Sequence, residues 1–153
     1  MSVTKIPKLE ECIRKKKILK TRPNPSRALA LLKISNLRNE FLHSIGDDKF
    51  ALFKIEIYYE IIKELLFANL YAEGYASKNH LCLLSFLQAT APDLTYEIEK
   101  INELRKVRNS ISYRGISIDS EYLQFNELEF RHIIKKLQER LEDYNNNEST
   151  IKK

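Results

Sequence analysis

The stretch KFALFKIEIYYEIIKELLFANLYAE, residues 49–73, decides the fold class of this 153-residue chain. It is apolar around most of a helical circumference. One narrow polar stripe runs along it, made of Glu56, Glu60, Lys63 and Glu64. A helix with so narrow a polar stripe has to be surrounded by other elements. We therefore expect it to be the central helix of a bundle, ended by Gly74 at a C′ position.

The segments on either side predict further helices. One begins after Ser26 as N-cap, another begins near Ser77, and a third is capped by Asp93 and stopped by Gly115. A last helix of about 24 residues follows the connection 116–120. The apolar seam expected for the first helix is Leu29, Leu32, Ile34, Leu37, Phe41 and Ile45. The seam expected for the last helix is Leu123, Leu128, Phe130, Ile133, Ile134, Leu137 and Leu141. Together these segments predict an all-α fold, an antiparallel bundle of four to five helices.

The charge is divided unevenly along the chain. Residues 1–25 hold eight cations and two acids, a net +6, whereas the remainder holds 18 cations and 19 acids, a net −1. The sequence Arg22-Pro23-Asn24-Pro25 disfavours helix and marks a boundary. We therefore divide the chain into a basic, partly ordered arm (1–25), a helical bundle (26–144) and a polar tail (145–153). The arm either attracts phosphate or is a solvated tail.

Several classes of site are not predicted. Cys12 and Cys82 lie far apart without a C-x-x-C pair, which predicts neither a zinc site nor a disulfide. Three histidines without cysteines or paired carboxylates at ligand spacing predict no metal site, and there is no phosphate-binding glycine-rich loop or other cofactor motif. Glu60 and Glu64 share a helix face, either as a reactive carboxylate pair or, more simply, as a buried polar network or dimer contact. Without a membrane span or a secretory signal, we expect a cytoplasmic protein.

Residues 103–115, ELRKVRNSISYRG, carry the strongest candidate for chemistry. At helical spacing, five polar side chains share an arc of about 140°: Arg105, Arg108, Asn109, Ser112 and Tyr113. Arg108 lies at the border with the apolar seam, where a guanidinium next to amide and hydroxyl groups suits phosphate. The simpler interpretation is a solvated face on which Arg105 pairs with Glu103 or Asn102.

The pattern Arg108-Asn109-x-x-x-Tyr113 resembles the signature helix of HEPN domains, in which arginine, usually followed by asparagine, precedes a histidine by four to six residues. Residues 58–66 and 74–80 are similar to the second and third helices of an archaeal branch of that family. The resemblance covers roughly residues 26–141.

The resemblance implies a homodimer whose two Arg-Asn motifs meet across a cleft. Active HEPN proteins cut RNA without metal, some act as toxins beside a minimal nucleotidyltransferase antitoxin, and others only bind RNA or nucleotide. By this resemblance Arg108, Asn109 and Tyr113 would be catalytic. The neighbouring residues Arg105, Ser112 and Arg114 would contact nucleic acid.

One departure from the pattern matters for activity. Tyr113 occupies the histidine position, and a phenol with a pKa near 10 is a poor general base at pH 7. Tyr113 still has a hydrogen-bond donor for a phosphate oxygen, and Arg108 still carries a charge for a developing oxyanion. The alternative is therefore a catalytically inactive helical module that dimerises or holds a protein partner.

The remaining histidines give weaker candidates. Arg38 and His43 also match the family spacing, but they lie about 140° apart in the first helix rather than late in the bundle. His80 follows a helix cap, where it can satisfy backbone groups. His132 is expected to be solvated. Arg108 and Asn109 are the preferred site.

Overall fold

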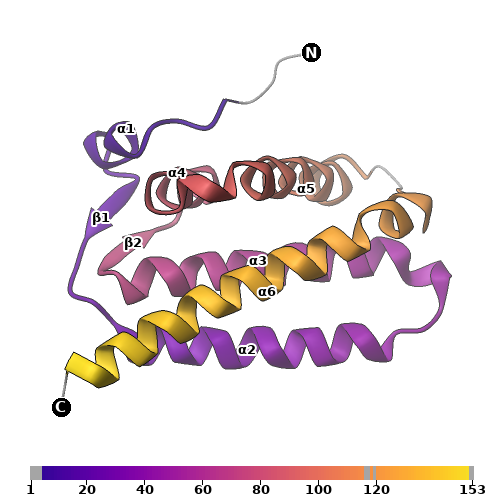
Figure 1. The fold of residues 1–153 in the computed structure, drawn as a ribbon. Helices are drawn as coiled ribbons and strands as arrows, with labels where there is room; N and C mark the ends of the chain where they lie inside the picture. Colours follow the sequence, from indigo (N-terminus) through magenta and orange to yellow (C-terminus); the bar gives the residue numbers. More distant parts are fainter. Residues whose placement is uncertain (1–4, 116–117, 119, 152–153) are drawn as a thin grey trace.

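The computed structural model describes the backbone of residues 5–115, 118 and 120–151, with side chains up to residue 144. Within these residues the chain forms six α-helices, two short 3-10 helices and one two-stranded sheet (Figure 1). In chain order they are α1 (Leu9–Arg14), β1 (Ile18–Lys20), α2 (Pro25–Ser44), η1 (Asp48–Phe50), α3 (Ala51–Ala72), β2 (Tyr75–Ser77), α4 (His80–Thr90), η2 (Pro92–Leu94), α5 (Thr95–Arg114) and α6 (Ser120–Ile151). The predicted all-α helical bundle is confirmed.

Helix α3 is the centre of the bundle, as its apolar circumference predicts. It packs against α2, α4, α5 and α6. In Figure 1, α2 runs along one side of α3, α4 and α5 along the other, and α6 crosses in front. Tyr58 of α3 is fully buried, and its ring centroid lies 5.4 Å from that of Phe130 on α6. Surrounding α3 in this way buries the apolar surface that drives folding.

The helix N-termini differ in detail from the prediction. Asn24 caps α2 and Asn79 caps α4, each by accepting a hydrogen bond from a backbone N–H three residues ahead. Ser26 lies inside α2, Ser77 belongs to strand β2, and Asp93 lies in η2 without capping α5. Asparagine and serine are comparable N-caps, so the sequence did not distinguish neighbouring candidates.

The basic arm is docked on the bundle. Strand β1 pairs antiparallel with β2, with Ile18 opposite Ser77, and Ile18 is fully buried. Helix α1 packs against α4, where Cys12 and Cys82 form a disulfide with a Cα–Cα distance of 6.0 Å. The expectation of no disulfide was therefore wrong. The pairing depends on the tertiary contact between α1 and α4, because cysteines 70 residues apart carry no local signal.

Gly74 allows the arm to pass close to the end of α3. Its φ is +90°, and a Cβ there would lie 3.0 Å from the Thr21 carbonyl oxygen. The Thr21 N–H donates to the Gly74 carbonyl oxygen at 2.8 Å. Glycine is thus required both for the predicted helix end and for the close approach of the arm.

Two predicted seams have different outcomes. Four of the six residues expected to be buried in α2 are exposed instead: Leu29, Ile34, Leu37 and Phe41. The buried residues of α2 are Ala28, Ser35 and Leu42, because α2 is an outer helix covered mainly by α3. In α6 the predicted seam is buried except for Leu128, which is 80% exposed. Helix α6 also continues to Ile151, beyond the boundary predicted at 144.

Two further predictions are only partly open to comparison. The connection expected at 116–120 lies mostly outside the described residues, as do the ends of the arm and of the tail. No helix in the described part of the chain combines the length and apolar composition that crossing a bilayer requires.

Candidate functional site

A cluster of charged side chains lies between α3 and α5. The Arg108 Nη2 atom is 3.3 Å from Oε1 of Glu60, and the Lys63 Nζ atom is 2.6 Å from Oε2 of the same carboxylate. Glu60 and Lys63 meet because they lie three residues apart on one face of α3. All three side chains are largely, but not fully, buried. The arginine of the predicted motif thus points toward the central helix.

Aromatic contacts connect this cluster to α4. The Arg108 guanidinium carbon lies 5.5 Å from the ring centroid of Tyr59, within range of a cation–π interaction. The Tyr59 hydroxyl is in turn 3.0 Å from Nδ1 of His80, the first residue of α4. The His80 ring also packs edge-on against Phe67. Arg108 and His80 therefore both contact Tyr59, one at the ring and the other at the hydroxyl.

The surroundings hold both the imidazole of His80 and the phenol of Tyr59 in their neutral forms. Burial lowers the pKa of His80, and the charges of Lys63 and Arg108 lower it further. Its imidazole is therefore unprotonated at neutral pH. Burial raises the pKa of Tyr59 to about 12, against the opposing effect of the nearby arginines Arg105 and Arg108. Tyr59 is consequently a protonated phenol.

The other predicted site residues are spread along α5 rather than gathered around Arg108. Arg105 donates from Nε to Oδ1 of Asn102 at 3.1 Å, as the simpler interpretation of this face expects. Asn109 is half-buried. The remaining three are exposed near the end of α5, namely Ser112, Tyr113 and Arg114. Tyr113 is 77% exposed, so its hydroxyl is available to a ligand but is not enclosed with Arg108.

A second arginine–carboxylate pair joins α2 to α3. Arg38 donates from Nε to Glu64, whose other oxygen, Oε2, is buried with no hydrogen-bond partner among the described residues. Burial raises the pKa of Glu64, against the effect of Arg38. His43 instead lies 2.7 Å from the backbone oxygen of Asn39 through Nδ1. Arg38 and His43 thus contact different partners and do not form a joint site.

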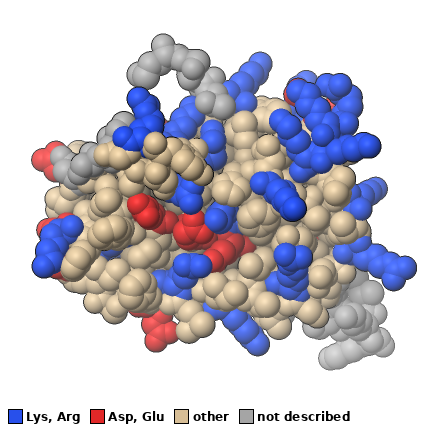
Figure 2. Space-filling model, turned by 180° about the vertical axis from the view of Figure 1, so that it is seen from behind, with Lys and Arg blue, Asp and Glu red and all other residues tan. Residues whose placement is uncertain are grey.

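Glu60 and Glu64 each face an arginine from a different neighbouring helix. This arrangement favours the polar-network interpretation of the pair over a reactive carboxylate dyad. Figure 2, which views the molecule from behind, shows carboxylate side chains near the middle of this face with lysine and arginine side chains around them. For Arg108 and Lys63, an anionic ligand would have to displace the Glu60 carboxylate that both cations contact.

His80 is a residue that the sequence did not connect with Arg108. Its spacing from Arg108 gives no signal, because the two residues lie on different helices that α3 brings together. The similarity of residues 74–80 to a HEPN segment is the one feature that could have drawn attention to it. His132, by contrast, has a mostly exposed side chain that lies 3.9 Å from Glu97, close to the predicted solvated position.

The chemistry available here is that of a guanidinium, a neutral imidazole and two phenols. Within the described residues, no group of three His, Cys, Asp or Glu side chains is placed to share a metal ion. A guanidinium can hold a phosphate, and a neutral imidazole within reach can accept a proton. No family model, no curated protein and no solved structure matches this chain.

Proposed function

We propose that this protein is an RNA- or nucleotide-interacting domain of the HEPN type, in which Arg108 binds phosphate and His80 supplies the imidazole that Tyr113 does not. The supporting observation is the contact of both Arg108 and His80 with Tyr59. Position 113 of the sequence motif holds tyrosine rather than histidine, and the tyrosine that the Arg108 guanidinium approaches, Tyr59, is also in contact with a histidine of α4.

The proposed reaction is attack of a ribose 2′-hydroxyl on the adjacent phosphate. His80, neutral because its pKa is lowered, accepts the hydroxyl proton as the new oxygen–phosphorus bond forms. The bond from phosphorus to the 5′-oxygen then breaks, and that oxygen takes a proton from the imidazolium of His80 or from water. Arg108 stabilises the charge that develops on the phosphate oxygens. Binding of the phosphate competes with Glu60 for the guanidinium.

Cleavage of a labelled RNA by Arg108→Ala and by His80→Gln, in the presence of a chelator, tests this proposal. Each change should lower the rate by about a hundredfold, the usual loss when a charge-stabilising or proton-accepting group is removed. Lys135→Ala removes an exposed cation from α6 and should cleave like the wild type. Equal rates for the wild type and Arg108→Ala would remove the proposed role of Arg108.

The position of the proton acceptor can be tested separately. Tyr113→Phe removes only the exposed hydroxyl and should retain most of the activity. If Tyr113→Phe abolished cleavage while His80→Gln did not, the assignment of the imidazole to His80 would be wrong.

A second candidate function is a dimerisation or protein-binding module, which the exposed apolar face of α2 favours. Ile34, Leu37 and Phe41 lie within an arc of about 60°. Phe41 also lines a recess of about 460 Å³ together with Phe50 and Phe53. Exposed apolar patches of this kind mark interaction sites. The occupant would be a second copy of the chain or the nucleotidyltransferase partner implied by the resemblance.

The mass of the protein in solution, alone and with that partner, tests the second candidate. Phe41→Glu should convert a dimer to a monomer or abolish binding of the partner, because it places a charge in the apolar recess. Phe125→Glu is the matched control, since Phe125 is 85% exposed on α6, away from this recess. If neither variant changes the mass or the binding, this face is not the interface.

A further inference from the structure

We propose that the docked N-terminal arm forms a basic groove that binds the sugar–phosphate backbone of single-stranded RNA and leads the strand toward His80. The choice of RNA as the polyanion rests on the proposed function. The groove itself is separate from the Arg108 cluster. It is built from residues 5–19 of the arm, strand β2, the start of α4 and the side chains of Arg27 and Tyr71.

The first observation is an excess of unpaired positive charge. Residues 5–22 contain eight cations and two acids: Lys5, Lys8, Arg14, Lys15, Lys16, Lys17, Lys20 and Arg22, against Glu10 and Glu11. Among the described residues, the one ion pair made by these cations joins Lys15 to Glu11 at 2.8 Å. Figure 2 shows lysine and arginine side chains gathered along the edge of the molecule that contains this segment, on the right.

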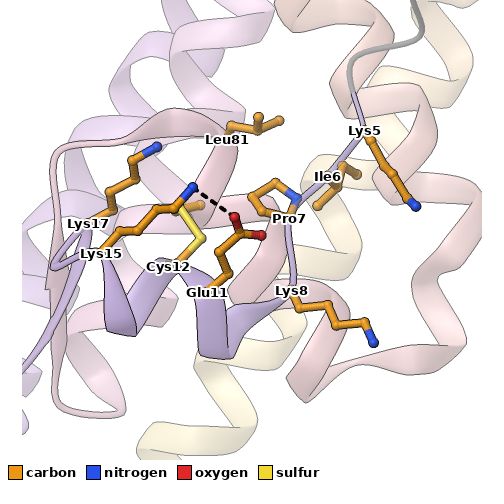
Figure 3. A pocket seen from close by; sticks show the side chains of 10 residues that line it. Lys5, Ile6, Pro7, Lys8, Glu11, Cys12, Lys15, Lys17 and Leu81 are labelled. Atoms are coloured by element: carbon orange, nitrogen blue, oxygen red, sulfur yellow. Dashed lines mark ion pairs between the residues drawn. A yellow bond between two sulfur atoms is a disulfide. The ribbon is translucent and has the colours of Figure 1, made fainter.

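The second observation is that these cations line a recess rather than a flat surface. A recess of about 430 Å³ lies between the arm and α4, beside the disulfide. Figure 3 shows Lys17 and the Glu11–Lys15 ion pair on one side of it and Lys5 and Lys8 on the other, with the side chains of Lys5 and Lys8 extending away from the ion pair. Four lysines that line one recess and the surface beside it provide several contacts for successive phosphates.

A second recess, of about 670 Å³, adjoins the first at Lys17. Lys17 lines both, and Lys16 and Lys78 also line the second. In the second recess the Arg27 guanidinium lies 4.2 Å from the ring centroid of Tyr71. A guanidinium stacked on an aromatic ring is a platform on which a nucleobase can stack, a combination typical of grooves that bind single strands.

The second recess reaches the N-terminus of α4, one residue before His80. Lys78 and Asn79 line the second recess, and the next residue is His80, whose ring contacts Tyr59 in the Arg108 cluster. A strand that follows the groove would therefore reach the end of α4 that carries the imidazole used in the proposed reaction.

The arm holds these cations in fixed positions. Cys12 and Ile18 are buried, β1 pairs with β2, and Ser77 Oγ donates to the Lys17 carbonyl oxygen at 2.6 Å. Lys16 adopts the left-handed conformation, with φ 58°, at the turn between α1 and β1. A preorganised row of cations loses less conformational entropy on binding than a free tail does. The recessed shape also suits a strand better than the flat surface of a bilayer.

The test measures binding of a fluorescent single-stranded oligouridylate to the full chain over a range of salt concentrations. The groove variant combines Lys8→Gln, Lys16→Gln and Lys17→Gln. The matched control combines Lys33→Gln, Lys54→Gln and Lys135→Gln, which remove the same charge from other helices. Anionic vesicles and inorganic phosphate serve as competing anions.

The wild type and the control should bind alike, whereas the groove variant should bind at least about tenfold more weakly at low salt. The slope of log affinity against log salt should fall by about 2, because each lost phosphate contact contributes about 0.7. Equal loss in the two triple variants would show that net charge alone matters and would overturn the groove. Binding to vesicles without binding to the oligouridylate would also overturn it.

The experiment separates this inference from the proposed function. Arg108→Ala should still bind the oligouridylate through the groove even though it no longer cleaves RNA. If Arg108→Ala cleaved like the wild type while the groove variant lost binding, the proposed catalytic function would fail and the groove would stand.

Discussion

The Arg108 cluster and the N-terminal arm are both rich in cations, but their cations have different surroundings. In the cluster, Arg108 and Lys63 share the Glu60 carboxylate and are largely buried between helices. In the arm, the lysines around the two recesses are exposed, and Lys15 is the one with a carboxylate partner among the described residues.

This difference in pairing and burial separates two properties of a binding surface, the long-range attraction of a polyanion and the local positioning of a bound group. Unpaired exposed charges attract a polyanion from a distance and bind it in a salt-dependent way. Paired, partly buried charges contribute little to that attraction, but they are held in place and act strongly on a group that displaces their partner. The arm is therefore suited to capture, and the cluster is suited to positioning and chemistry.

The largest expected effect concerns how the arm is attached. Cys12→Ser should lower the free energy of unfolding by about 4 kcal/mol, because the disulfide closes a loop of 70 residues in the unfolded chain. Urea unfolding of the variant and of the wild type, each with and without reductant, measures this loss. Reductant should destabilise the wild type and leave Cys12→Ser unchanged. Identical stability of all four samples would mean that the arm is not held by this bond.

The next effect tests the backbone approach between the arm and α3. Gly74→Ala should cost about 2 kcal/mol, since alanine is strained at φ +90° and its Cβ would crowd the Thr21 carbonyl oxygen. In Gly74→Ala, hydrogen exchange of the β1 amides should be accelerated relative to the wild type, and more so than exchange of the α3 amides. Ala76→Gly, in the paired strand β2, is a control that adds flexibility without crowding the arm. Equal exchange of β1 in the wild type and Gly74→Ala would argue against a tightly docked arm.

The sequence predicts the bundle better than it predicts the attachment of the arm. The apolar circumference of residues 49–73 identified α3 as the central helix because burial on all sides has a direct periodic signature. Gly74 and Gly115, both with positive φ, mark helix ends for an equally local reason. The β1–β2 pairing and the Cys12–Cys82 disulfide depend on contacts distant in sequence, which leave no periodic trace.

The candidate site also combines features that have a local sequence signal with features that depend on contacts distant in sequence. Arg108 was selected as a candidate from the resemblance of residues 108–113 to the HEPN pattern, and its position at the border of the apolar seam is consistent with its partial burial. Its contacts with Glu60 and Tyr59, and the approach of His80, required the packing of α3, α4 and α5. The exposed face of α2 was mistaken for a seam because an apolar stripe does not reveal what covers it.

A smaller effect on stability is expected within the cluster. Glu60→Gln should cost about 1 kcal/mol, because it leaves Arg108 and Lys63 partly buried without their shared carboxylate. Lys8→Gln in the arm should change the unfolding free energy by no more than about 0.5 kcal/mol, as is usual for an exposed side chain. Urea unfolding of both variants at low and moderate salt compares the two regions directly. Equal effects of the two changes would remove the distinction between paired and unpaired cations.

The smallest effect is a dependence of stability on pH. The pKa of His80 in the folded protein lies below its ordinary value of about 6.5, chiefly because of burial. The unfolded chain therefore takes up a proton at this position more readily than the folded protein does. The stability that neutral His80 contributes is present above about pH 6.5 and is lost as the pH falls through the folded-state pKa.

Urea unfolding between pH 8 and pH 5.5 should show this decline in the wild type and a weaker decline in His80→Gln. His43→Gln is the control, because His43 is exposed on α2 and should decline like the wild type. Burial raises the pKa of Glu64, so protonation of this carboxyl at lower pH favours the folded protein, opposite to the effect of His80. Glu64 is present in all three proteins, so its contribution to the pH dependence is the same in each. The difference between the wild type and His80→Gln therefore isolates the imidazole. Parallel curves for these two proteins would mean that burial does not hold the His80 imidazole neutral. The Arg108 cluster would then lack the proton acceptor that the proposed chemistry requires, whereas capture of RNA by the arm would be unaffected.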